Sequence, residues 1–214
     1  MANNVLIFGD SYSTFENFIP DGYAAYYTKA GHPGTDVRRV EETWWHQVIT
    51  KADMNLILNN SWSGSTICYT GYNNTDCSQS SSFIYRLRKL IEQGFFEKNK
   101  VDTVFVFGGT NDSWADASIG TLKYGNWNEK DLYSVLPAIS YFLKTLKDKL
   151  PEARIYCLIN TELKSEIFEG MREACRIYGI TEITFDAIDK ECGHPTIKGM
   201  QDIKNTVLNI INRK

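Results

Sequence analysis

The sequence predicts a three-layer α/β fold, in which helices cover both faces of a five-stranded parallel sheet. Short apolar runs alternate with longer amphipathic segments along the chain, which is the pattern of strands that alternate with helices. Most of the apolar runs end in a turn of small polar residues. Because parallel strands joined by right-handed crossovers all point the same way, these turns should meet at one edge of the sheet.

The first predicted strand is the apolar run from Val5 to Phe8, which is bounded by Gly9. The clearest central strand is VDTVFVF at residues 101–107, which stops at two glycines. We expect the five strands at residues 5–8, 56–58, 101–107, 154–159 and 182–186.

Five helices are expected between and after these strands. Thr43 is a candidate N-cap for the first helix, and the helix that begins near Ser82 has its apolar residues on one side. Pro151 and Gly179 stand just beyond two later helices, where such residues commonly stop a helix. The helices are expected at residues 43–54, 82–97, 131–150, 163–178 and 196–212.

The length and composition are those of one globular domain. The 214 residues, of which 43% are hydrophobic, are enough to bury a full core, and no repeat or low-complexity tract interrupts them. We expect a single domain over residues 1–214 with elaborated loops at about 12–42, 61–81 and 112–130. A loop as long as the first of these is typical of a functional loop.

The charge pattern gives no basis for binding nucleic acid or an anionic membrane, because the formal net charge of -3 is small and unclustered. No stretch approaches eighteen apolar residues, so no membrane span is expected. The first residues lack the charged and apolar regions of a signal peptide, so we expect a cytoplasmic location for the chain as it stands. A secreted or periplasmic location follows instead if a signal peptide has been removed.

The five cysteines, an odd number, lack the CxxC and Cys/His spacings of zinc sites. We therefore expect neither a metal site nor a disulfide scaffold, and most of the thiols should be reduced. A local bridge between Cys68 and Cys77 stays open at this point. The chain also lacks a GxGxxG fingerprint, and no cofactor is expected.

Ser11 is the candidate nucleophile, because it lies on the turn that ends the first strand. Ligands of open α/β sheets bind outside the carboxyl ends of the strands, which is where this hydroxyl should be. The simpler alternative is that Ser11 only caps the segment that follows. The same edge of the sheet should also collect Gly64, Asn111 and His194.

These four residues can supply most parts of an acyl-transfer site. Ser11 would attack the acyl carbon, and His194 would act first as general base and then as general acid. The backbone N–H groups of Ser11 and Gly64 and the side-chain amide of Asn111 would hold the oxyanion.

Four short motifs carry these residues, in order along the chain: GDS at residues 9–11, the turn at Gly64, GTND at residues 109–112, and His194 followed by Pro195 and Gly199. In this order they resemble blocks I, II, III and V of the GDSL-type or SGNH hydrolases, a family named for its Ser, Gly, Asn and His. The resemblance implies a flavodoxin-like SGNH hydrolase fold. It also implies a serine esterase or acylhydrolase that works without a cofactor.

The family's pattern has an aspartate three residues before the catalytic histidine, where this chain has Glu191. Because glutamate can replace aspartate as the orienting acid, the resemblance implies Glu191 for this role, with Asp189 as the alternative. Either carboxylate can instead belong to a solvated turn beside Lys190. Of the other histidines, His46 is expected to be structural, and His32 lies in the long loop, where it meets solvent or substrate.

The family includes lipases, thioesterases, phospholipid acylhydrolases and carbohydrate deacetylases, so the resemblance implies the reaction and not the acyl donor. Aromatic residues interleaved with Asn, Asp, Ser and Thr in the loops favour a sugar over a long acyl chain. We expect a short-acyl ester, acetyl above others, carried by a carbohydrate or another small molecule. The aromatic residues are Tyr12, Tyr23, Tyr26, Tyr27, Trp62, Tyr69, Tyr72, Trp114, Tyr124 and Trp127.

Other functions stay open at this point. One is a lipase or thioesterase of the same family. Another is a non-catalytic carbohydrate-binding relative, in which Glu191 no longer completes a triad. A third is a flavodoxin-like cofactor binder that uses residues 9–13 as a phosphate loop.

Overall fold

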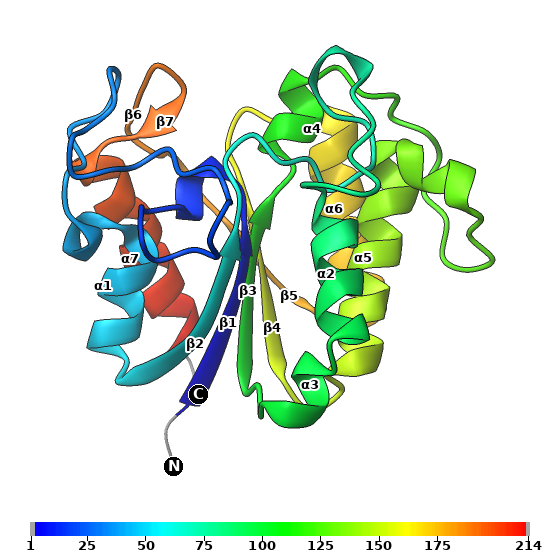
Figure 1. The fold of residues 1–214 in the computed structure, drawn as a ribbon, viewed down its shortest axis with the longest axis horizontal. Coiled ribbons are helices and arrows are strands. Elements are labelled where there is room, and N and C mark those ends of the chain that lie inside the picture. Colours follow the sequence, from blue (N-terminus) through cyan, green and yellow to red (C-terminus); the bar gives the residue numbers. More distant parts are fainter. Residues whose placement is uncertain (1–2, 213–214) are drawn as a thin grey trace.

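A five-stranded parallel sheet forms the centre of the protein, as the sequence predicts (Figure 1). The computed structural model describes residues 3–212. The strands follow the order β2-β1-β3-β4-β5, and each neighbouring pair is parallel. The strands are β1 (Asn3–Gly9), β2 (Met54–Ser61), β3 (Thr103–Gly108), β4 (Arg154–Ile159) and β5 (Thr181–Thr184).

Helices cover both faces of this sheet, which confirms the three-layer prediction (Figure 1). Two helices lie on one face, α1 (Trp44–Lys51) and α7 (Ile197–Ile211). The opposite face carries α2 (Phe83–Glu92), α3 (Phe95–Lys98), α5 (Val135–Lys149) and α6 (Ser165–Tyr178).

Two hydrophobic cores follow from the alternation of side chains along each strand. In β1, Val5 and Ile7 belong to the core on the α1 and α7 side of the sheet, and both are fully buried. Leu6 and Phe8 belong to the core on the other side and are also fully buried. A strand that is apolar on both faces is typical of a parallel sheet covered on both sides.

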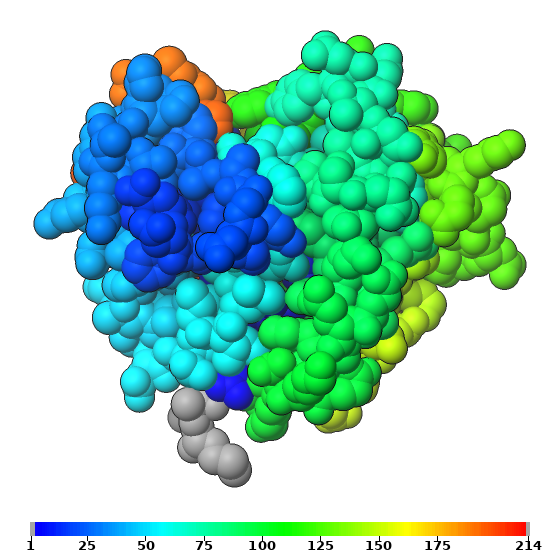
Figure 2. Space-filling view, in the orientation of Figure 1, coloured from blue at the N-terminus to red at the C-terminus, as the bar shows by residue number. Residues whose placement is uncertain are grey.

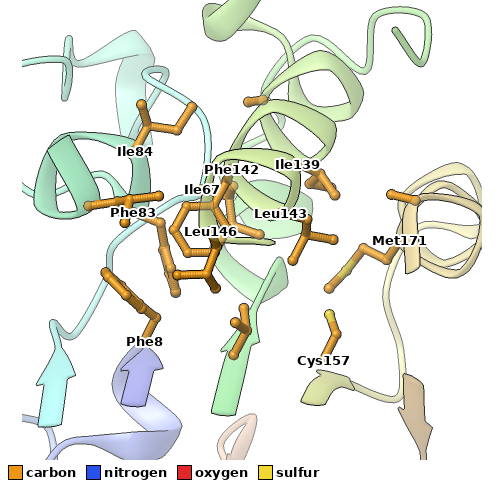
Figure 3. Packing of buried hydrophobic residues seen from close by; sticks show 14 of the residues in the cluster. Phe8, Ile67, Phe83, Ile84, Ile139, Phe142, Leu143, Leu146, Cys157 and Met171 are labelled. Atoms are coloured by element: carbon orange, nitrogen blue, oxygen red, sulfur yellow. The ribbon is translucent and has the colours of Figure 1, made fainter. Parts of the chain in front are cut away.

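The core beneath α2, α5 and α6 is built around three phenylalanine rings (Figure 3). The ring centroid of Phe142 lies 5.3 Å from that of Phe8 and 5.7 Å from that of Phe83, in edge-to-face arrangements. Met171 and Cys157 extend this core toward α6. Edge-to-face pairs add to the free energy gained from apolar burial. They therefore help to fix β1, whose carboxyl end leads to Ser11.

Three predicted helices are shorter than the sequence pattern indicates. The first stops before Asp53, which has a positive φ of 49°, and Met54 begins β2 instead. The second stops before Gly94, whose left-handed conformation (φ 64°) separates α2 from α3. The third begins only at Val135, after a 3-10 turn at Glu129–Tyr133.

Two elements at the carboxyl edge of the sheet are not predicted by the sequence pattern. One is the short helix α4 (Thr110–Trp114), which begins directly after Gly109. The other is an antiparallel hairpin of two-residue strands, β6 (Lys190–Glu191) and β7 (His194–Pro195). Both elements are too short to show a hydrophobic period. Each of them carries a candidate site residue.

Two further expectations concern the cysteines and the membrane. All five cysteines are free thiols, so the bridge between Cys68 and Cys77 is absent. Four of the thiols are buried, and Cys192 is exposed. Within residues 3–212, no helix combines the length and the apolar character needed to cross a membrane.

Candidate active site

Ser11 lies directly after β1, in a 3-10 turn that spans Ser11–Ser13. Asp10 caps this turn, because its Oδ1 accepts a hydrogen bond of 3.0 Å from the Tyr12 N–H. Gly9 leaves no room for a side chain, since a Cβ atom there would lie 2.5 Å from two serine side chains. The turn therefore fixes Ser11, which is 3% exposed, at the edge predicted from the sequence.

Asp10, the neighbour of Ser11, is a fully buried carboxyl group. Burial raises its pKa to about 7, although its hydrogen bond from the Tyr12 N–H acts in the opposite direction. Among the described residues, its Oδ2 has no hydrogen-bond partner. Burial of a carboxyl group favours its protonated form. Asp10 therefore caps the turn without carrying a full negative charge next to Ser11 at neutral pH.

His194 meets Ser11, although the two residues are 183 positions apart in the sequence. The Nε2 atom of His194 lies 3.0 Å from the Oγ atom of Ser11, which is a hydrogen-bond distance. This is the geometry that a general base needs to take a proton from a hydroxyl group.

The other ring nitrogen of His194 faces a backbone carbonyl. Its Nδ1 lies 3.2 Å from the carbonyl oxygen of Cys192, two residues earlier. Glu191 pairs with His194 across the hairpin, but its side chain is exposed, and Asp189 accepts a hydrogen bond from the Thr196 hydroxyl. In the described part of the chain, no hydrogen bond joins the ring to either carboxylate. The tight turn brings the carbonyl of Cys192 to Nδ1 instead.

Two tyrosine hydroxyls hold the backbone of the hairpin on either side of His194. The Tyr12 hydroxyl donates a hydrogen bond of 2.5 Å to the carbonyl oxygen of Gly193. The Tyr27 hydroxyl donates one of 3.0 Å to the carbonyl oxygen of Pro195. Both tyrosines are fully buried, so water does not compete for these bonds.

Aromatic rings surround the imidazole of His194. Tyr26 stacks on it, with ring centroids 3.6 Å apart and an angle of 7° between the planes, and Trp114 meets it edge to face at 5.8 Å. Burial lowers the pKa of His194, the hydrogen bond to the Cys192 carbonyl opposes this effect, and the charges of His32 and Lys190 lower the pKa further. The ring is therefore neutral over a wider pH range than an ordinary histidine, as a general base must be.

The two backbone donors expected at the oxyanion, the N–H groups of Ser11 and Gly64, have no partner in the described part of the chain. Gly64 is exposed and has a positive φ of 80°, and a Cβ atom placed there would have no neighbour within 4 Å. A glycine suits this position because its backbone is left-handed, and the empty space lets another molecule approach the N–H.

Asn111 lies in the first turn of α4 and is 3% exposed. Its Nδ2 donates a hydrogen bond of 3.0 Å to the carbonyl oxygen of Ser65. Its Oδ1 accepts one of 2.8 Å from the Tyr72 hydroxyl. These two bonds fix the amide and leave its second N–H for another acceptor.

Asp112 and Arg86 hold the segment that contains Gly64. The buried carboxylate of Asp112 accepts hydrogen bonds from the N–H groups of Ile67 (2.8 Å) and Cys68 (3.0 Å). The fully buried guanidinium of Arg86 donates to Ser65 Oγ at 3.0 Å, and it also donates to the carbonyl oxygens that end β1 and β2. Burial lowers the pKa of Arg86 to about 9, so it remains a cation at neutral pH.

Sequence reasoning missed these supporting roles for a physical reason. Arg86 lies on a helix that shows a polar and an apolar side, so it is easily read as part of the solvated side. Asp112 adjoins Asn111 in the GTND motif, and this position was the one signal that it belongs to the site. The role of the Cys192 carbonyl leaves no signal, because a backbone group can come from any residue type.

The remaining histidines lie where the sequence places them. His46 is inside α1 next to Trp45, whose ring centroid is 5.8 Å from its own. His32 lies in the long loop, is exposed, and packs against Tyr26 with 4.2 Å between ring centroids. Within the described residues, no group of three or more His, Cys, Asp or Glu side chains could hold a metal ion.

A known protein family matches nearly the whole chain. The family model described as GDSL-like lipase/acylhydrolase matches residues 3–211. No curated protein sequence matches the chain significantly.

Solved structures share the fold. A protein described as a GDSL-like lipase from Bacteroides ovatus has a TM-score of 0.92 and 41% identity, with full coverage of both chains (100% each). A second, from Bacteroides uniformis, has a TM-score of 0.90 and 44% identity, covering 100% of this chain and 97% of that one. A family two carbohydrate esterase from Clostridium thermocellum has a TM-score of 0.66 at 15% identity, covering 99% of this chain and 64% of that one. At this identity the last similarity concerns the fold alone.

Proposed function

The chain belongs to the GDSL-like lipase/acylhydrolase family and is an ester-cleaving hydrolase, and from this premise we propose that Ser11 attacks a short-acyl ester carried by a carbohydrate. The observation that carries the proposal is the 3.0 Å contact between Ser11 Oγ and His194 Nε2. It joins a hydroxyl to a base with a lowered pKa, which is the pair that nucleophilic catalysis needs.

In the first half of the reaction, Ser11 Oγ forms a bond to the acyl carbon while its proton moves to His194 Nε2. The carbonyl oxygen of the ester becomes an oxyanion, which the N–H groups of Ser11 and Gly64 and the amide of Asn111 stabilise. The bond to the sugar oxygen then breaks, and that oxygen takes the proton from His194. The product is an acyl ester on Ser11 and a free alcohol.

In the second half, a water molecule attacks the acyl carbon and gives one proton to His194 Nε2. The bond to Ser11 Oγ breaks, the serine recovers its proton from His194, and the carboxylic acid leaves. In both halves the ring becomes an imidazolium. The Cys192 carbonyl, 3.2 Å from Nδ1, can stabilise that cation and fix the tautomer that leaves Nε2 free.

The surroundings of the reacting pair favour a short acyl group and a sugar. Rings of Tyr26 and Trp114 pack on His194, whereas a long acyl chain would need an aliphatic channel. Trp114, which contacts His194, and Tyr72, which binds Asn111, are large and exposed, at 42% and 39%. Aromatic faces beside hydroxyl and amide groups suit the apolar C–H patches and the hydroxyls of a sugar ring.

Two measurements test the proposal. An organophosphonate should label wild-type protein at Ser11 and should fail to label Ser11→Ala, which mass spectrometry of the intact chain detects. The kcat/KM should fall from acetyl to butyryl to octanoyl esters, and acetylated oligosaccharides should be deacetylated.

Each alternative predicts a different result. A lipase or thioesterase would prefer the octanoyl ester or the thioester, and a non-catalytic carbohydrate-binding protein would resist labelling. The first result would overturn the short-acyl ester substrate, and the second would overturn Ser11 as the nucleophile.

A further inference from the structure

A pocket whose lining does not include Ser11 or His194 lies beside the segment that contains Gly64. It has a volume of about 370 Å³, and its walls come from the long N-terminal loop, the end of β2 and α2. Figure 2 shows the N-terminal loop (blue) lying against the segment around residue 60 (cyan) and α2 (green) on this face of the molecule. The volume is at the lower end of the range of ligand pockets, which fits one or two small rings.

An aromatic pair forms one wall of this pocket. Tyr23 and Trp62 pack against each other in a tilted arrangement, with ring centroids 4.2 Å apart and 33° between their planes. Both side chains are half-buried, so each keeps an accessible part. The two backbone segments that carry these rings are joined next to them by a hydrogen bond of 2.8 Å from the Ser63 N–H to the Ala24 carbonyl oxygen. The pair is therefore a fixed apolar surface and not two independent side chains.

Apart from Tyr85 and Leu90, the rest of the lining is polar, and its charges already have partners. Gln79 and Gln93 present amide groups, and Leu90 is the one aliphatic residue in the lining. Lys89 forms an ion pair of 2.9 Å with Glu92, and the donors of Arg86 are directed to backbone carbonyls and Ser65. An acyl chain would need more aliphatic surface, and an anion would need a free cation. The lining therefore favours a neutral polyhydroxyl ring.

The turn that contains Trp62 connects the pocket to the segment that ends in Ser11. The N–H of Trp62 donates a hydrogen bond of 3.1 Å to the carbonyl oxygen of Gly9, two residues before Ser11. Trp62 also precedes Gly64 by two residues, so one ring of the aromatic pair lies in the same turn as the proposed oxyanion donor. A chain of sugar rings that carries its ester at Ser11 can continue past Gly64 toward this surface.

We propose that the pocket lined by Tyr23, Trp62, Gln79 and Gln93 is a subsite for a neutral pyranose ring of the substrate's alcohol part. This inference rests on the proposed function for the ester itself. The ring's C–H face packs on the Tyr23–Trp62 surface, and the two glutamine amides bind its hydroxyls. The subsite gives selectivity for oligosaccharide esters over small esters.

The first experiment measures binding of sugar without cleavage. Unacetylated xylotetraose, cellotetraose and mannotetraose are titrated by calorimetry into the wild type and into variants. We expect at least one of them to bind, and we expect Trp62→Ala and Tyr23→Ala each to weaken its binding by about tenfold, the effect of losing one aromatic contact. Trp62→Phe should retain most of the affinity, because a ring remains in place.

Matched controls separate the subsite from general effects. Phe18→Ala removes an exposed aromatic ring of the same loop that lines a different pocket, and it should leave binding unchanged. Gln79→Ala should weaken binding, whereas Gln201→Ala, an exposed glutamine on α7, should not. In kinetics, the ratio of kcat/KM for the acetylated oligosaccharide to that for a small acetate ester should fall by about tenfold in Trp62→Ala.

Several results overturn the inference. They are failure of all three neutral sugars to bind, binding that is unchanged in both Trp62→Ala and Tyr23→Ala, or a preference for a uronic acid or a sugar phosphate. The binding test does not depend on ester cleavage. A protein that binds sugar through Trp62 but cleaves no ester would refute the proposed function and keep the subsite. If the protein cleaves esters but the variants change neither sugar binding nor the kcat/KM ratio, the subsite is refuted and the proposed function is kept.

Discussion

Ser11 and His194, the two residues proposed to react, are held in different ways. Ser11 follows a central strand, and its turn is fixed by bonds within a few residues, such as that from the Tyr12 N–H to Asp10 Oδ1. His194 lies in a two-residue hairpin outside the main sheet. Its backbone is held by the hydroxyls of Tyr12 and Tyr27, which are 181 and 168 residues away from their acceptors.

This difference separates chemistry from positioning. Around Ser11, local sequence determines the geometry, so a substitution there removes a reacting group or a donor. Around His194, distant hydroxyls determine the geometry, so a substitution can leave every reacting group present but misplaced. The two regions should therefore respond to substitution by very different amounts.

The largest effect is expected from removing a reacting group itself. Ser11→Ala and His194→Ala should each lower kcat for a small acetate ester on the order of a millionfold. The first removes the attacking hydroxyl, and the second removes the base that takes its proton. Thermal unfolding should show that both variants remain folded. A Ser11→Ala protein with the wild-type rate would contradict the assignment of the nucleophile.

The next largest effect is expected from Asn111, whose side-chain amide is proposed to stabilise the oxyanion. Asn111→Ala should lower kcat by about 100- to 1,000-fold, with little change in KM, because the donor acts on charge that develops in the transition state. Steady-state kinetics measure this change. Asn209→Ala, an exposed asparagine on α7, is the control and should behave as the wild type. A loss in Asn111→Ala confined to KM would mean that the amide binds substrate instead.

The same contrast explains what the sequence could predict. Hydrophobic runs and polar turns are local, so the five strands, the sheet edge and the convergence of Ser11 with His194 followed from them. The observed helix ends differ from the predicted ones where single residues have a left-handed backbone, as at Asp53 and Gly94.

The hairpin and the partner of His194 Nδ1 could not be predicted. A strand of two residues is too short to show an alternation of apolar and polar side chains. A backbone carbonyl can come from any residue, so the sequence does not mark which one will bind the ring. The carboxylates of Glu191 and Asp189 were the natural candidates for that partner in the sequence, and the tight turn at Cys192 instead brings its own carbonyl to the ring.

A moderate effect is expected from the hydroxyls that hold the hairpin. Tyr12→Phe should lower kcat by about tenfold, because it leaves the carbonyl oxygen of Gly193 without its donor and loosens the residue before His194. Tyr178→Phe is the matched control. It removes a partly buried hydroxyl that forms a hydrogen bond with Ser140, which lies on α5 and not at the candidate active site. Both variants should lose some thermal stability, but only Tyr12→Phe should lose kcat. An equal kcat in the two variants would mean that the hairpin is held without Tyr12.

A smaller effect concerns pH. Burial lowers the pKa of His194, so the neutral base persists below the ordinary histidine value of about 6.5, and kcat/KM should fall only at lower pH. Tyr26→Ala exposes the His194 ring to water, so the pH below which kcat/KM falls (the acid limb) should move upward, toward the ordinary value. Tyr26→Phe keeps the stacked ring and should leave the limb in place. A limb that stays fixed in Tyr26→Ala would contradict burial as the cause.

The smallest effect sharpens the comparison most, because it asks whether His194 uses a carboxylate at all. Glu191→Gln and Asp189→Asn should each change kcat by less than about threefold, since neither carboxylate bonds to the ring and both side chains are exposed. A triad acid would behave differently, because its amide variant stabilises the wrong tautomer and lowers kcat by about 10⁴-fold. Kinetics across the pH range distinguish the two cases. If Glu191→Gln alone is slow, the glutamate moves onto Nδ1 during the reaction and replaces the Cys192 carbonyl as the partner of His194.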